Sequence, residues 1–453
     1  MEKMNWLQLL NPSRVGQEIS LKQSAERSLF EQDYDRIIFS HPFRRLQDKT
    51  QVVPLPEDDF VHTRLTHSLE VSSVGRSLGK KVGDFVTTNY PELGKHDYSP
   101  SDFGAIVAAA ALAHDIGNPP FGHSGEDAIS EFFLYNNFGK GIKAAVSSDE
   151  WADLTSFEGN AQGFRLFNLP DNKGIQLTYS TLAAFSKYPH AANLKHKIAG
   201  RKSQKKYGFF QSEAYYFNEL ANSLGLNKLA ENEKSWVRHP LAFLVEAADD
   251  ICYHIIDLED GCRLGWVSFE QARDLLAGVL GDKYMPEKLE KTRDKNDKIS
   301  YLRALAINTL IEQCSAVFIQ NEAKILTGEF DKALMDLVPA KKVLKEIIAV
   351  SIEKIYRSKL VLETEAVGHT VLEGLMEAFI MAALAQKASE ESSKKELTVF
   401  RLLPAVFQEQ IIETGSPYQI CRIVIDYISG MTDRFAINLY RKLTGISLPG
   451  TKI

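Results

Sequence analysis

The sequence predicts an all-α fold, with a helical core in its N-terminal part and an additional helical lobe in its C-terminal part. Apolar residues recur at intervals of three and four over long stretches, the spacing of one helix face. The two-residue alternation typical of strands is rare. Hydrophobic residues make up 44% and charged residues 25% of the chain, as in an ordinary globular protein.

The first long helix is predicted over residues 65–86. Its apolar residues fall on one side of the helix, which indicates a face that packs on a core. These residues are Leu65, Leu69, Val74, Leu78, Val82 and Phe85.

A second helix is predicted to begin after Ser101 and Asp102, whose side chains suit a helix cap, and to run to His114. Residues 104–113 are apolar nearly all round, so we expect this helix to be buried. Gly117 and the prolines that follow it at 119 and 120 predict the stop.

A third helix is predicted from near Pro240 to about Asp260, before Gly261. At 1.5 Å per residue it would be about 30 Å long.

A soft boundary is predicted at residues 284–298, which are polar and highly charged and therefore suit a linker or an exposed loop. It divides the chain into residues 1–283 and 284–453. In the second part helices are expected at 341–359 and 372–387, and a polar break at 389–395.

Several classes of protein are disfavoured by the bulk properties. We find no apolar stretch near the ~20 residues of a membrane span and no signal-peptide pattern, so a cytoplasmic protein without membrane contact is expected. The four cysteines form no Cys-x-x-Cys pair, which indicates neither a structural zinc site nor a disulfide framework. The net charge of −6 argues against a dedicated nucleic-acid coat but permits a local basic patch.

His114 and Asp115 are the most informative residues, because they end a predicted buried helix. Burying an imidazole and a carboxylate is costly unless they are paired or bound to a metal. Taken alone, the pair would more simply be a polar helix end at the surface; the matching residues on other helices reverse this interpretation.

Other helices supply matching groups. His67 lies three residues after Arg64 and so shares a helix face with it. Asp249 lies in an otherwise apolar stretch, with Tyr253 and Asp257 on the same face at four and eight residues further. An acidic face can simply be solvated, but this one also carries apolar residues, as the wall of a cleft would.

Together, His67, His114, Asp115 and Asp249 offer two imidazoles and two carboxylates from three helices. Such a set can hold one divalent ion and leave positions open for water and substrate. Mixed nitrogen and oxygen ligands suit Mn²⁺, Mg²⁺, Ni²⁺, Fe²⁺ or Zn²⁺, so the ligands do not decide which metal binds. A metal site of this kind is typical of metal-dependent hydrolases.

At these residues the chain resembles the HD-domain phosphohydrolases, whose mark is a histidine, a His-Asp doublet and a later aspartate. The resemblance is closest to the bacterial deoxyguanosine triphosphate triphosphohydrolases. It is carried by five strings that span nearly the whole chain in order, at residues 35–47, 63–70, 114–126, 157–165 and 426–434. It implies an HD-domain core in residues 1–283 and a helical region 284–453 that completes the fold.

The resemblance also implies roles for single residues. The metal ligands would be His67, His114, Asp115 and Asp249. Catalysis would rest on His123, with Glu126 as the carboxylate that orients it; the alternative is that both only stabilise a loop. Substrate contacts would be made by Gln47, Arg64, Asn160, Lys187, Tyr188, Tyr253 and Asp257.

Two of these groups have a specific expected task. Arg64 resembles a phosphate clamp. Gln47 and Asp257 resemble the residues that hold the sugar 3′-hydroxyl and crowd out a 2′-hydroxyl. Glu158 and Arg165 could as well be structural.

The expected activity is hydrolysis of a deoxynucleoside triphosphate, dGTP in particular, to a deoxynucleoside and inorganic triphosphate, in a hexamer or tetramer. An HD-type nucleotidase or phosphodiesterase and a nucleotide-sensing regulatory protein are the alternatives. A basic run over residues 195–206 is most simply a solvated loop, but single-stranded DNA is a second hypothesis for it.

Overall fold

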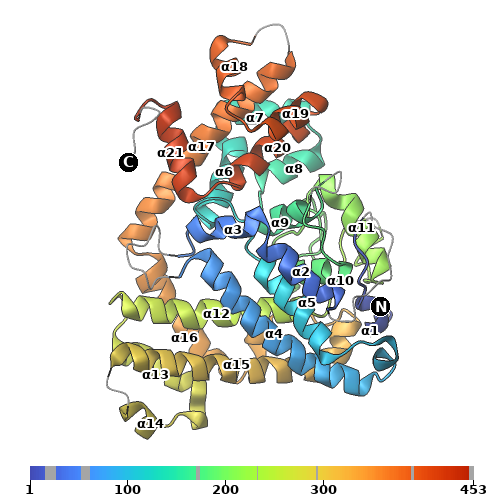
Figure 1. Ribbon diagram of the computed structural model, residues 1–453, viewed down its shortest axis with the longest axis vertical. Coiled ribbons are helices and arrows are strands. Elements are labelled where there is room, and N and C mark those ends of the chain that lie inside the picture. Colours follow the sequence, from blue (N-terminus) through green and yellow to red (C-terminus); the bar gives the residue numbers. More distant parts are fainter. Residues whose placement is uncertain are drawn as a thin grey trace.

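The computed structural model describes residues 1–15, 27–52, 62–169, 174–231, 233–291, 294–388 and 392–447. Over these residues the protein is all-α, with isolated β-bridges and no strand, as the sequence predicts (Figure 1). Residues 389–391 of the predicted polar break lie outside the described residues.

The first half of the chain contributes helices of very different length. They are α1 (Trp6–Leu9), α2 (Leu29–Ile38), α3 (His41–Arg45), α4 (Arg64–Asn89), α5 (Pro100–Ala113), α6 (His123–Tyr135), α7 (Asn137–Gly141), α8 (Ser148–Thr155), α9 (Gly159–Phe167), α10 (Tyr179–Phe185) and α11 (Ala214–Ser223).

The second half contains the longest helices. They are α12 (Ala242–Arg263), α13 (Phe269–Leu280), α14 (Pro286–Glu290), α15 (Lys295–Leu326), α16 (Lys341–Ser351), α17 (Lys359–Ala388), α18 (Lys394–Phe400), α19 (Ala405–Glu413), α20 (Pro417–Ser429) and α21 (Asp433–Leu443).

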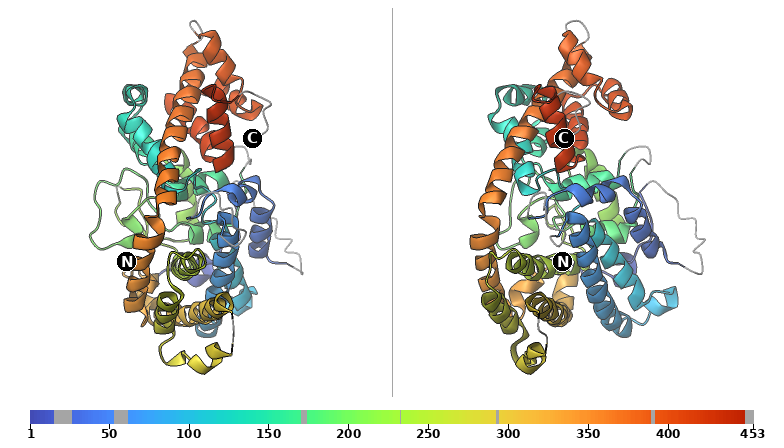
Figure 2. Two further views of the ribbon diagram at one scale, coloured as in Figure 1. Left: turned by 90° about the vertical axis from the view of Figure 1, so that its left-hand side faces the viewer. Right: turned by 60° about the vertical axis from the view of Figure 1, so that its left-hand side comes forward.

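Two hydrophobic clusters organise these helices. The larger one is built on α4, α5, α12 and α15, with Val71, Ile106 and Ile255 buried in it. The smaller one is built on α6, α17 and α20, with Phe132 and Phe379 buried in it. Figure 1 shows the first group in the lower half and the second in the upper half, and Figure 2 shows α17 extending from the second group toward the first.

The packing of α4 on α5 fixes the site, because it is unusually close. Gly79 of α4 lies so near α5 that a Cβ atom there would be 2.6 Å from the carbonyl oxygen of Phe103. Gly75 and Gly83, one turn to either side, face α5 in the same way. Small residues at every fourth position thus let the two backbones approach, and α5 is buried over nearly its whole length, as predicted.

Most predicted helices are confirmed, with small shifts at their ends. The helix expected over 65–86 is α4, and that expected from Pro240 is α12. The helix expected over 341–359 is wrong at its end, because a π-helical turn at Ile352–Tyr356 separates α16 from α17. The segment 284–298 is largely exposed as expected, but it is not an open linker, since it contains α14 and the start of α15.

The composition of α15 and α17 bears on the expectation that no apolar stretch is long enough to span a membrane. Each is long and apolar enough to cross a membrane by length and composition alone. Half of the residues in each apolar window are buried inside the fold, a pattern that the core helix of a globular protein also has. This is weak evidence for a span.

Candidate active site

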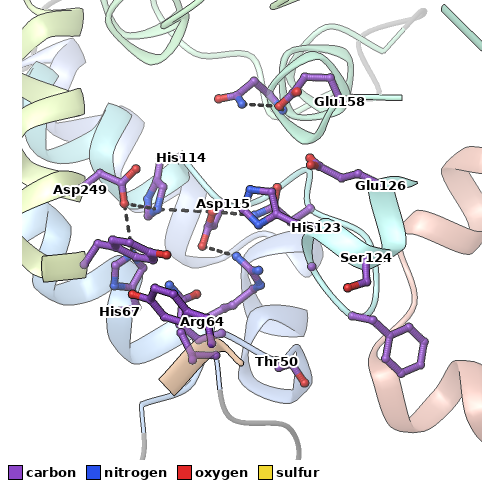
Figure 3. A pocket seen from close by; sticks show the side chains of 18 of the residues that line it. Thr50, Arg64, His67, His114, Asp115, His123, Ser124, Glu126, Glu158 and Asp249 are labelled. Atoms are coloured by element: carbon purple, nitrogen blue, oxygen red, sulfur yellow. Dashed lines mark hydrogen bonds and ion pairs between the residues drawn. The ribbon is translucent and has the colours of Figure 1, made fainter. Parts of the chain in front are cut away.

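The centre of the site is a cluster of His67 from α4, His114 at the end of α5 and Asp249 from α12. One ligand atom from each of the three lies within 4.8 Å of the other two. The Asp249 Oδ1 atom is 3.3 Å from His67 Nε2 and 3.4 Å from His114 Nε2. Figure 3 shows the three side chains pointing toward one another. This spacing suits a metal ion.

The His114 ring is set for ligation by its own helix. Its Nδ1 atom lies 2.7 Å from the carbonyl oxygen of Ala111, which only an Nδ1–H group can approach as a donor. The proton is thereby assigned to Nδ1, and Nε2 is left with a lone pair. Burial lowers the pKa of His114, which favours this neutral form.

Asp115 is adjacent to the cluster but turned toward other partners. Its Oδ1 lies 3.4 Å from His114 Nε2 and accepts a hydrogen bond from Asn118 Nδ2 at 2.6 Å. Its Oδ2 accepts one from Arg64 Nη1 at 2.6 Å. Burial opposes ionisation of Asp115, but the Arg64 charge outweighs it and holds the pKa of the carboxyl well below its usual range.

Asp249 has a second partner in Lys187. The Lys187 Nζ group donates to Asp249 Oδ2 at 2.6 Å, and the lysine side chain is buried. Burial opposes ionisation, but Lys187 and the two histidines hold the pKa of Asp249 well below its usual range. One carboxylate oxygen of Asp249 is thus fixed by Lys187, while the other faces the two imidazoles.

His123 and Glu126 lie in the first turn of α6, on one face of that helix. A turn with positive φ at Phe121 (64°) and Gly122 (60°) precedes them. A Cβ atom at Gly122 would be 2.6 Å from Arg64 Nη2, so a side chain there would displace the Arg64 guanidinium. A non-glycine residue with positive φ beside a cavity is typical of functional sites.

The Glu126 carboxylate is held by groups other than His123. Its Oε1 accepts a hydrogen bond from the Gly159 N–H at 2.7 Å, and its Oε2 lies 3.4 Å from Lys206 Nζ. Desolvation, together with the cations Lys206 and Arg64, lowers the pKa of His123.

All these groups line one cavity of about 550 Å³. Its walls come from α4, α6 and α12, from connecting loops and from the beginning of α17, which contributes Val361, Thr364 and Glu365. Both predicted parts of the chain therefore contribute to it.

Comparison with known proteins bears on this geometry. Residues 64–150 match the HD domain, and residues 336–442 match the phosphohydrolase-associated domain. A deoxyguanosinetriphosphate triphosphohydrolase-like protein of Synechocystis is 42% identical, and one of Pseudomonas aeruginosa 40%, each over 98% of this chain and 100% of its own length. The deoxyguanosinetriphosphate triphosphohydrolase of Cronobacter sakazakii is 32% identical over 98% of both chains.

The chain belongs to the family of deoxyguanosinetriphosphate triphosphohydrolase-like proteins. It is an HD-type phosphohydrolase.

The structure gathers nearly all the site residues that resemblance to this family implied. The cavity is lined by Arg64, His67, His114, Asp115, His123, Glu126, Asn160, Lys187, Tyr188, Asp249 and Tyr253. Gln47 and Asp257 do not line this cavity.

Gln47 is exposed and outside the cavity, which corrects its expected position at the sugar. Gln51, four residues further along, lines the cavity instead, and its Oε1 atom is buried without a hydrogen-bond partner. Gln51 lies four residues beyond the string 35–47 that carried the resemblance, so the resemblance pointed to Gln47 alone.

Asp257 lies one layer below the cavity wall. The Tyr356 hydroxyl donates to Asp257 Oδ2 at 2.6 Å, and the Tyr356 ring stacks on Tyr253 with centroids 5.4 Å apart. Burial raises the pKa of Asp257 to about 7. Tyr356, which lines the cavity, was missed because it lies in the unpredicted π-helical turn, a feature often found at functional sites.

Glu158 and Arg165, left open by the sequence, differ in position. Glu158 lines the cavity and accepts a hydrogen bond from Asn160 Nδ2 at 2.6 Å. Arg165 lies outside it and pairs with Glu213 and Asp426, which joins α9 to α20. Arg165 is therefore structural.

Proposed function

We propose that this protein hydrolyses deoxynucleoside triphosphates, dGTP among them, to a deoxynucleoside and inorganic triphosphate, with one divalent metal ion. The observation that carries the proposal is the single cavity. It joins a His-His-Asp cluster, a histidine next to a carboxylate, and four cationic side chains, Arg64, Lys187, Lys205 and Lys206.

The metal ligands in this proposal are His67, His114, Asp115 and Asp249. The residues fit such an ion, because His114 presents a free Nε2 lone pair and Asp249 Oδ1 faces both rings at distances too long for strong hydrogen bonds. A bound divalent ion supplies Lewis-acid polarisation of a phosphoryl oxygen. Nitrogen and oxygen ligands admit Mn²⁺, Mg²⁺, Ni²⁺, Fe²⁺ or Zn²⁺.

In the proposed reaction, water attacks the α-phosphorus and the bond from phosphorus to the sugar 5′ oxygen breaks. His123 donates a proton to the departing oxygen, and the water proton leaves with the solvent. Histidine suits this task because an imidazole ring can hold and give up a proton near neutral pH. Glu126 orients the ring.

Cationic side chains line the cavity together with carboxylates, and the cations are the groups that can bind a polyphosphate. Arg64 lines the cavity beside Asp115 and is the proposed phosphate clamp, with Lys187, Tyr188 and Asn160 as further contacts. Phosphoryl transfer depends mainly on positioning and on stabilising charge, which such a wall provides.

The sugar end is assigned to a different wall. The stacked rings of Tyr253 and Tyr356 offer an apolar surface, and the Gln51 Oε1 atom is a free acceptor for the 3′-hydroxyl. Asp257 acts from below through Tyr356. We therefore transfer to Gln51 the sugar contact that the sequence assigned to Gln47.

Product analysis tests the proposal directly. With dGTP and Mn²⁺, the protein should release intact triphosphate and deoxyguanosine in equal amounts, as resolved by ion-exchange chromatography. Release of single phosphates, or turnover of monophosphates or cyclic nucleotides alone, would favour the nucleotidase or phosphodiesterase alternative. Absence of turnover across all four dNTPs would favour a nucleotide sensor.

Three wider expectations stay predictions: a hexamer or tetramer, a cytoplasmic location and single-stranded DNA binding by the basic run. Light scattering after size-exclusion chromatography measures the first. A low-salt electrophoretic-shift titration tests the binding of single-stranded DNA, and the absence of any shift would reject that hypothesis.

A further inference from the structure

The basic run over residues 195–206 ends inside the active-site cavity rather than on an open surface. Ser203 donates from its N–H and its hydroxyl to Asp331 Oδ2 at 3.1 and 2.7 Å, and Arg201 pairs with the same oxygen at 3.3 Å. These bonds fold the run back onto the protein. Lys205 and Lys206 follow directly and line the cavity.

Lys206 binds two carboxylates at once. Its Nζ atom lies 3.4 Å from Glu126 Oε2 and 3.1 Å from Glu158 Oε2, and both glutamates are buried. Their other oxygens accept hydrogen bonds, from the Gly159 N–H and from the Asn160 amide. Two buried carboxylates therefore share one ammonium group.

Lys206 also stands between two cavities. A second cavity of about 510 Å³ is lined by Lys206, Glu126 and Glu158 from its other side. The three side chains thus line both cavities, so a change of charge there is a change at the edge of the active site.

The ionisation of Glu126 and Glu158 depends on the charge of Lys206. Burial raises the pKa of both glutamates, and the Glu126 charge raises that of Glu158 further. The Lys206 charge opposes both effects. Two carboxylates that share a site do not both stay ionised unless a cation compensates them.

We propose that Lys206 is a positioning residue, which keeps Glu126 ionised beside Glu158 so that Glu126 can orient His123 and stabilise its protonated ring. The proposal rests on the proposed roles of His123 and Glu126. A neutral Glu126 would hold the imidazolium less well, because it offers no opposite charge.

The test removes the cation and then one of the two anions. For Lys206→Met we expect kcat to fall by about tenfold or more, the size of a weakened acid-base contribution, with a smaller change in KM. Lys206→Arg should retain most of kcat because it keeps the charge. Adding Glu158→Gln to Lys206→Met should recover much of the lost kcat, since a single carboxylate needs less compensation.

Lys197→Met is the matched control. It removes the same charge from the same basic run at a residue that lines only the second cavity. It should leave kcat and KM near their wild-type values. If circular dichroism shows that Lys206→Met does not fold, Lys206→Gln takes its place in the comparison.

Two results would overturn the proposal. A rise in KM at unchanged kcat would mean that Lys206 only binds substrate. A double variant no more active than Lys206→Met would mean that the two carboxylates do not compete for the charge. The products of the wild-type protein are identified first, and the variants are compared on whichever nucleotide it hydrolyses, so failure to form triphosphate counts against the proposed function alone.

Discussion

Arg64 and Asp115 form a buried ion pair, with Arg64 Nη1 2.6 Å from Asp115 Oδ2. The family resemblance implied separate tasks for these residues, as a phosphate clamp and a metal ligand. The pair connects the two expected tasks, because the carboxylate beside the His-His-Asp cluster also holds a cation that lines the cavity.

Asp115→Ala should therefore damage the protein in two ways. We expect loss of bound metal, measured by mass spectrometry of the purified protein. We also expect a loss of about 3 to 5 kcal/mol in unfolding free energy, because Arg64 is left buried without its partner. Retention of one metal ion per chain would show that Asp115 serves Arg64 alone.

His123→Ala should separate chemistry from metal binding. His123 is not part of the metal cluster, so the variant should keep its metal content. Its kcat should fall by about 10² to 10⁴, the usual contribution of an acid-base group. A near-normal rate would exclude His123 from the reaction.

Gly159→Ala should disturb the site through one added methyl group. A Cβ atom there would be 2.1 Å from Asn118 Oδ1 and 2.8 Å from Glu126 Oε1. We expect kcat to drop and the unfolding free energy to fall by about 1 to 3 kcal/mol. Gly141→Ala is the control, since its Cβ atom would meet nothing within 4 Å, and it should match the wild type.

Gln51→Ala and Gln47→Ala compare the two candidate sugar contacts. Loss of the hydrogen bond at Gln51 should lower kcat/KM for a dNTP by about tenfold, which corresponds to about 1.4 kcal/mol. Gln47 is exposed outside the cavity, so its variant should behave like the wild type. The opposite ranking would restore Gln47.

His62→Gln should change the pH dependence of stability. His62 Nδ1 lies 2.8 Å from Asp260 Oδ2, and Nε2 lies 3.3 Å from Glu70 Oε1. Burial disfavours the charged ring, but hydrogen bonds to the two carboxylates outweigh it and raise the pKa of His62 to about 10 from 6.5.

Because the folded-state pKa is the higher one, this stabilisation is complete below pH 6.5 and is lost as the pH rises to about 10. Denaturant unfolding should thus show wild type and variant differing by about 2 kcal/mol near neutral or slightly acidic pH. The difference should shrink toward pH 10. A constant difference would contradict the prediction.

The sequence by itself determined the helical class, the burial of α5 and the end of that helix before Gly117. These features are local: the spacing of apolar residues selects the helix face, and glycine and proline act on their own backbone. His67, the His-Asp doublet and Asp249 also sufficed to predict that three helices meet at the site.

Only the tertiary structure decided which side chains near those motifs face the cavity. Gln51 rather than Gln47, Tyr356 above Asp257, and Lys206 between Glu126 and Glu158 depend on contacts between residues far apart in the chain. No periodicity records such contacts, because they follow from how the helices pack. The electrostatics of the site arise at that same level, since one ammonium group compensates two carboxylates only after folding has brought them together.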